Sequence, residues 1–114
     1  MLTYIQSLAR MEGFGKAGDI PTRDHNPGDI CAGKFTSAHG AIGADGRFAQ
    51  FATDDEGFAA LRALLLEHYV GMTVAAAIAK YAPACENCTA NYIKVVCQLS
   101  GLTPDTVLTA DNIG

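Results

Sequence analysis

The uneven placement of glycine constrains this chain more than any other feature. Eight of its twelve glycines fall between Gly13 and Gly46, together with Pro21 and Pro27, and both residue types disfavour the interior of long helices. The remaining segments show helical periodicity. The sequence therefore predicts an α+β domain, mostly α, over residues 1–114. A small β-hairpin region would lie between a short first helix and a C-terminal helical bundle.

Apolar spacing and turn residues place the first elements. An apolar stripe predicts a helix over about residues 2–11 that ends at Gly13. Alternating residues predict a short strand over 47–51, and Asp45-Gly46 suits a hairpin turn just before it.

Capping signals place the later helices. Thr53, followed three residues later by Glu56, is a capping-box pattern that opens a strong helix. Two further helices are expected, one between Thr73 and Pro83 and one over about residues 87–99. Thr103-Pro104-Asp105 would open one short final turn or helix, since proline is favoured at the first helical position.

Composition excludes several classes of protein. The chain is 49% hydrophobic and 18% charged, which argues against intrinsic disorder. A net charge of -4 and a pI near 5.1 argue against nucleic acid as the main partner. We find no apolar run long enough for a membrane span and no secretory signal in the first residues.

Four cysteines leave their chemistry open. Cys31, Cys85, Cys88 and Cys97 permit two disulfides in three connectivities, and one or two disulfides or free buried thiols are expected. If Cys88 and Cys97 share a helix they lie about 13 Å apart, too far for a bridge. Cys85 and Cys88 form a C-x-x-C without a second close pair for zinc and without the βαβ context of a redox motif. We expect no metal and no cofactor.

Glu12 is the first candidate for chemistry. It continues the apolar stripe of the first helix, and it lies at the end of the helix dipole that disfavours a negative charge. Both effects should raise its pKa, which suits a general acid near neutral pH. The alternative is a frayed last turn that leaves Glu12 in solvent.

The segment after Glu12 is polar. Residues 13–18 match G-x-G-x-x-G, but they follow a helix instead of a strand, so we reject dinucleotide binding. An extended loop would lead to the turn signal Asn26-Pro27-Gly28-Asp29. This turn would fold the loop back and bring Asp24, Asn26 and Asp29 near Glu12.

Several segments with a common order and spacing support a resemblance. They are residues 10–14, 23–30, 33–35, 40–43, 48–51, 56–61 and 81–93. Together they resemble the small lysozyme-like proteins of phages and prophages. These proteins are related to lytic transglycosylases and carry an R-N-N-N-P-G-N-I-like loop. The resemblance spans about Leu8 to Leu108.

The resemblance implies a lysozyme-like fold and cleavage of the β-1,4 bond between N-acetylmuramic acid and N-acetylglucosamine. It implies a monomer that acts on peptidoglycan strands in the periplasm or cell wall. Glu12 would be the catalytic acid, and Tyr81 would lie near it. The sugar groove would be lined by Asn26, Gln50, Glu86 and Asn87. The chain departs from the pattern at Asp24 and Asp29, where amides are expected, and at Cys85 and Cys88.

The number of catalytic carboxylates stays open. An inverting hydrolase needs a second carboxylate, for which Asp19, Asp24 and Asp29 are candidates. A lytic transglycosylase needs only Glu12, because the muramyl 6-hydroxyl attacks intramolecularly, and we slightly favour this mechanism. The alternatives are an inactive virion or wall-binding protein of the same fold and a chitinase- or chitosanase-like glycosidase.

Overall fold

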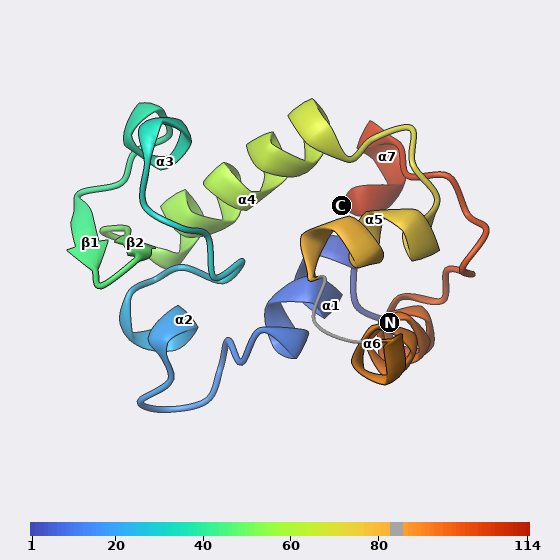
Figure 1. The fold of residues 1–114 in the computed structure, drawn as a ribbon. Helices are drawn as coiled ribbons and strands as arrows, with labels where there is room; N and C mark the ends of the chain where they lie inside the picture. The colour runs from blue at the N-terminus through green and yellow to red at the C-terminus, as the bar shows by residue number, and fades with distance from the viewer. Residues whose placement is uncertain (83–85) are drawn as a thin grey trace. The chain divides into compact units, whose positions relative to one another are not determined.

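About half of the chain is helical, and one short hairpin supplies its strands (Figure 1). The structure is a computed structural model that describes residues 1–82 and 86–114, the side chains of residues 86 and 87 excepted. The coarse prediction of a mostly helical α+β protein is confirmed. The elements, in order, are α1 (Tyr4–Met11), α2 (Ile20–Arg23), α3 (Lys34–Ala38), β1 (Gly43–Asp45), β2 (Phe48–Gln50), α4 (Asp54–His68), α5 (Val74–Tyr81), α6 (Glu86–Ser100) and α7 (Ala110–Ile113).

The chain divides into two compact units, and the single domain over residues 1–114 stays a prediction. The central unit comprises residues 8–64, and the terminal unit comprises residues 1–7 and 65–114. Both α1 and α4 run from one unit into the other along the chain.

The hairpin lies in the central unit where the sequence predicted it. Strands β1 and β2 pair antiparallel with Asp45 opposite Phe48, so a two-residue turn joins them. Gly46 in this turn has a φ of +60°, a conformation that glycine adopts without strain. Ala49 and Phe51 are buried with Ala60 of α4 and form a small apolar core.

Short helices occupy part of the region predicted to be irregular or β. In α2, Pro21 falls in the first turn, where its fixed φ suits a helix and its missing N–H costs nothing. Before α2, residues 13–18 form successive turns with positive φ at Gly13, Gly15 and Gly18, so the extended loop expected there is wrong. These glycines let the chain double back instead of extending.

The terminal unit confirms two predicted helix boundaries. The Thr73 side chain caps α5 by accepting a hydrogen bond from the Ala76 N–H at 3.2 Å. Helix α6 ends where Gly101 follows with a φ of +75°. The buried core residues of this unit are Tyr4, Ile5, Leu65, Tyr69, Val74, Ala77, Ile78, Tyr92, Val96, Leu108 and Ile113.

Of the turn or helix expected after Thr103, the structure has the turn. Thr103 donates its N–H to the Thr106 hydroxyl at 3.0 Å, which closes this turn. Helix α7 instead starts after Thr109, whose hydroxyl accepts from the Asn112 N–H at 3.1 Å while Asn112 binds back to the Thr109 N–H at 2.8 Å. This reciprocal pair satisfies the N–H groups of Thr109 and Asn112 at the start of α7.

Among the described cysteines, Cys31 and Cys97 are free and Cys88 is disulfide-bonded, which fits the expectation of one disulfide. Cys85 lies outside the described residues. None of the helices within the described ranges has both the length and the apolar character that a membrane span requires.

Candidate functional site

Glu12 lies at the end of α1, as the sequence predicted. Its N–H donates to the Leu8 carbonyl at 3.0 Å, so it completes the last helical turn. Leu8 and Ala9 on the same stripe are buried, and Glu12 itself is half-buried. Gly13 follows with a φ of +99° and ends the helix. The alternative of a fully exposed, frayed Glu12 is therefore wrong.

The turns after Glu12 bring a second carboxylate beside the helix end. A Cβ built on Gly13 would lie 2.9 Å from Oδ2 of Asp19, so the exposed Asp19 side chain reaches back to the residue next to Glu12. The Gly15 N–H donates to the Thr22 hydroxyl at 2.8 Å. The Phe14 ring packs edge-on against Phe58 of α4, with 5.2 Å between centroids. These contacts hold the segment in place.

Asn26 organises the loop that follows α2. Its side-chain amide donates to the Ile30 and Ala49 carbonyls at 2.9 and 3.0 Å, and its oxygen accepts from the Ile30 N–H at 3.0 Å. The Asp29 N–H donates to the Asn26 carbonyl at 3.0 Å, which confirms the predicted turn. Asn26 is 0% exposed. We predicted that it would line a sugar groove, but its burial and saturated amide assign it to holding the loop on β2.

At Gly57, helix α4 lies so close to this loop that a side chain at that position would not fit. A Cβ at Gly57 would lie 1.9 Å from the His25 carbonyl oxygen and 2.7 Å from Pro27 Cδ. His25 has a φ of +53°, which is uncommon for a residue other than glycine. Its Nδ1 lies 2.7 Å from an Asp54 carboxylate oxygen at the start of α4. No local pattern in the sequence marked Gly57 or His25 for these contacts.

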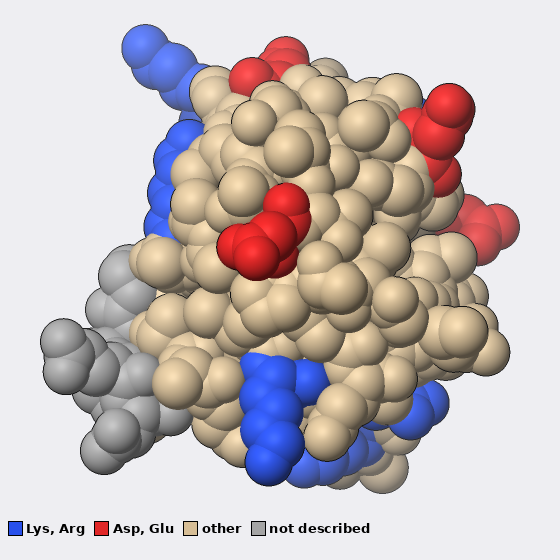
Figure 2. All heavy atoms as spheres, turned by 90° about the vertical axis from the view of Figure 1, so that its right-hand side faces the viewer, with Lys and Arg blue, Asp and Glu red and all other residues tan. Residues whose placement is uncertain are grey.

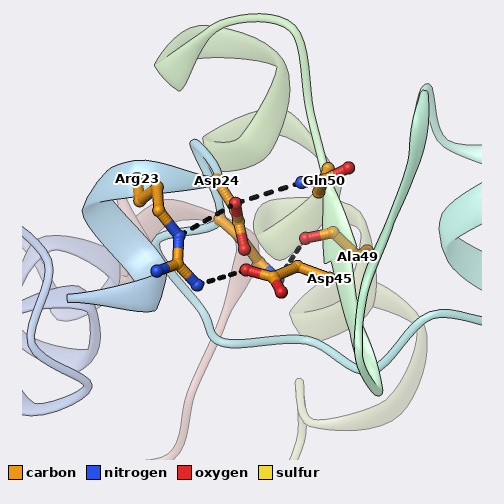
Figure 3. A network of polar contacts seen from close by, with 6 residues as sticks. Arg23, Asp24, Asp45, Ala49 and Gln50 are labelled. Carbon is orange, nitrogen blue, oxygen red and sulfur yellow. Dashed lines mark hydrogen bonds and ion pairs between the residues drawn. The ribbon is translucent and has the colours of Figure 1, made fainter. Parts of the chain in front are cut away.

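A network of charged side chains links the end of α2 to the hairpin (Figure 3). Arg23 binds the Asp45 carboxylate, and its Nε lies 3.7 Å from Oδ1 of Asp24. Gln50 on β2 donates to the same Asp24 oxygen at 3.3 Å. Asp29 also faces Asp24 and Arg47. We call Asp24, Asp29 and Asp45 the carboxylate cluster.

Two members of the carboxylate cluster, Asp45 and Asp29, have a shifted pKa. The polar groups of neighbouring Asp24 and Arg23 lower the pKa of Asp45. Burial raises the pKa of Asp29; Arg47 opposes this shift, and the negative charge of Asp24 adds to it. Asp24 is 4% exposed. Within the part of the chain that the structure describes, Asp24 Oδ2 and Asp29 Oδ1 are buried without a hydrogen-bond partner.

The other predicted site residues belong to the terminal unit. Tyr81 ends α5, is half-buried and packs edge-on against Tyr69, with 5.6 Å between ring centroids. Glu86 and Asn87 begin α6, and their side chains lie outside the described residues. The predicted neighbourhood of Tyr81 and Glu12 stays a prediction.

The described surface shows few features that suggest an ionic ligand. Among residues 1–82 and 86–114, no group of three or more His, Cys, Asp or Glu side chains is arranged to hold a metal ion. On the face in Figure 2, uncharged residues cover most of the described surface, and Lys and Arg lie towards its left and lower margins.

Comparison with known proteins adds no relative. No family model matches the chain, and neither a curated protein nor a solved structure matches it. The geometry of the chain's own residues therefore has to support any functional proposal.

Proposed function

We propose that this protein is a glycosidase of lysozyme-like fold that cleaves the MurNAc-β-1,4-GlcNAc bond of peptidoglycan, with Glu12 as general acid. The observation that carries the proposal is the half-buried position of Glu12 at the C-terminal end of α1, where Asp19 reaches back beside it. The substrate is a peptidoglycan strand in the periplasm or cell wall.

Glu12 would donate its proton to the glycosidic oxygen as the bond to the muramyl carbon breaks. The carbonyl end of α1 disfavours a negative charge on this side chain, and partial burial acts in the same direction. Both effects favour the protonated form that a general acid needs before the reaction.

The second group differs between the two mechanisms left open by the sequence. Asp24 Oδ2 and Asp29 Oδ1 are buried, so these oxygens are poorly placed to activate a water beside a sugar. Asp19 is exposed and adjacent to Gly13. If the enzyme is an inverting hydrolase, Asp19 is the carboxylate that activates water. If it is a lytic transglycosylase, Glu12 serves first as acid and then as base, and Asp19 is dispensable.

The decisive experiment compares Glu12→Gln with Glu56→Gln. Glu56 is an exposed glutamate in the first turn of α4 in the same unit, so it controls for the loss of one carboxylate. Loss of a general acid should slow release of soluble muropeptides by about 100-fold or more, while Glu56→Gln should match the wild type. Both variants should keep the wild-type circular dichroism spectrum.

A folded Glu12→Gln protein that releases muropeptides at the wild-type rate would overturn the proposal. A wild-type protein that binds insoluble peptidoglycan without releasing fragments would instead indicate a wall-binding protein of this fold. Release from chitin oligomers but not from peptidoglycan would indicate the chitinase-like alternative.

Mass spectrometry of the fragments distinguishes the two mechanisms. Reducing ends that disappear in Asp19→Asn indicate a hydrolase with Asp19 as second carboxylate. Anhydromuramyl ends that persist in Asp19→Asn indicate a lytic transglycosylase.

A further inference from the structure

The segment after Glu12 has little backbone stiffness of its own. Gly13, Gly15 and Gly18 all have a positive φ, between +86° and +100°, which glycine adopts because it is the least restricted residue. The same freedom makes a glycine-rich segment costly to order unless other groups fix it. Glu12 is joined directly to this segment, so the contacts that hold the segment also limit where the end of α1 can lie.

The hydroxyl of half-buried Thr22 holds this segment. It accepts the Gly15 N–H at 2.8 Å, and it donates more weakly to the Gly13 carbonyl at 3.5 Å. The Thr22 N–H donates to the Asp19 carbonyl at 3.1 Å, and the Asp19 carboxylate reaches back beside Gly13. Thr22 therefore contacts both the segment joined to Glu12 and the residue that carries the second candidate carboxylate.

Thr22 is itself held in place by the loop that packs on the hairpin. It lies in α2, whose Pro21 is buried, and the Pro21 carbonyl accepts the N–H of buried Asn26 at 2.9 Å. The Asn26 side chain in turn donates to the Ala49 carbonyl of β2 at 3.0 Å. Because threonine is branched at Cβ, its χ1 angle has few allowed values, so the position of α2 fixes the position of the hydroxyl.

We propose that Thr22 is a positioning residue that holds Glu12 in the place from which it donates its proton. This inference rests on the proposed function of Glu12, and it adds a residue that acts through the backbone of Gly13 and Gly15. Proton transfer needs donor and acceptor within about 2.6–3.2 Å, and a misplacement of about 1 Å can lower a rate by about 100-fold. Loss of the Thr22 hydroxyl should therefore slow bond cleavage more than it weakens substrate binding.

Thr22→Val tests the proposal because valine keeps the shape of threonine and removes only the hydroxyl. Gly15 is exposed, so water can replace the lost bond to its N–H, and the midpoint of urea unfolding should change little. With soluble glycan strands prepared from peptidoglycan as the substrate, kcat should fall by about tenfold while KM stays within about twofold. Thr22→Ser keeps the hydroxyl and should recover kcat to within about threefold of the wild type.

Thr53→Val is the matched control in the same unit. The Thr53 hydroxyl also accepts a main-chain N–H, that of Glu56 at 3.2 Å, but it caps α4 instead of holding the segment after Glu12. This variant should lose stability and keep the wild-type kcat. If Thr53→Val lowered kcat as much as Thr22→Val, the loss would come from general destabilisation, and the positioning role would be refuted.

Hydrogen exchange measured by NMR tests the same link without using activity. The Glu12 N–H donates to the Leu8 carbonyl, and the Ala49 N–H donates to the Ile30 carbonyl, both at 3.0 Å. In Thr22→Val, protection of the Glu12 amide should fall by about tenfold, whereas protection of the Ala49 amide should stay within about twofold of the wild type. Equal protection of the Glu12 amide in the wild type and in Thr22→Val would contradict the proposal.

The outcomes separate this proposal from the proposed function. If Glu12→Gln is inactive but Thr22→Val keeps the wild-type kcat, the positioning role is wrong and the proposed function stands. If Glu12→Gln releases fragments at the wild-type rate, the proposed function is wrong, and the positioning role of Thr22 falls with it, whatever the exchange data show.

Discussion

Replacing Gly57 with alanine should destabilise the central unit, because α4 meets the His25–Pro27 loop there without room for a methyl group. The built Cβ lies 1.9 Å from the His25 carbonyl oxygen, whereas real Cβ contacts essentially never fall below 3.0 Å. The backbone must therefore retreat by about 1.1 Å, the difference between these two distances.

The surrounding contacts make that retreat costly. The next residue, Asn26, is buried and fixed by three hydrogen bonds, and His25 is held by Asp54. Overpacking of this kind costs about 1–3 kcal/mol, and alanine recovers about 0.8–1.0 kcal/mol over glycine in a helix. Because these bonds limit how far the loop can move, we expect a net fall in the free energy of unfolding of about 1–2 kcal/mol.

Urea unfolding followed by circular dichroism measures this change, provided that the m value stays constant. Gly33→Ala is the matched control. Its φ of 171° is extended, and a Cβ there meets no heavy atom within 4 Å. The control should stay within about 0.5 kcal/mol of the wild type. If Gly57→Ala proved as stable as the wild type, the close approach of α4 to the loop would be refuted.

Three further substitutions test other contacts. Asn26→Ala leaves the Ile30 and Ala49 groups unbonded and should lower the free energy of unfolding in urea by about 2–3 kcal/mol; a loss under about 1 kcal/mol would contradict its role in the loop. Thr73→Ala removes the cap of α5 and should cost about 0.5–2 kcal/mol in the same assay, and an unchanged midpoint would contradict the capping bond. Burial raises the pKa of Asp29 above 3.8, so ionisation of Asp29 weakens the fold as pH rises past the unfolded value. Asp29→Asn should therefore unfold at higher urea than the wild type near pH 7, and this advantage should vanish below about pH 3.5; equal stability at both pH values would contradict the shift.

Local signals predicted much of the secondary structure. The apolar stripe before Gly13, the Asp45-Gly46 turn and the Thr73 cap each placed an element within a few residues of its observed position. These signals succeed because caps, turns and amphipathic spacing act over three or four residues. The reciprocal cap at Thr109, which opens α7, was not among the signals noted in the sequence.

Long-range contacts were not predictable in the same way. The groove role expected for Asn26 assumed an exposed loop, but the loop turns its amide inward onto β2. Gly57 carries no local signal, since glycine inside a helix only lowers helix propensity. Gly57 matters because the His25–Pro27 segment, about thirty residues earlier in the chain, packs against it. A pattern of neighbouring residues does not predict such a contact.

The sequence alone determined that this chain is a mostly helical α+β protein whose first helix ends near Glu12, with Glu12 on its apolar stripe. Those features depend on spacing within one helix or turn. The tertiary structure alone decided which carboxylates meet. Asp24 and Asp29 lie in the loop after α2, whereas Asp45 lies in β1, and the pKa shifts of Asp29 and Asp45 depend on burial and on nearby polar groups. Both are properties of the packed chain and not of any short stretch of residues.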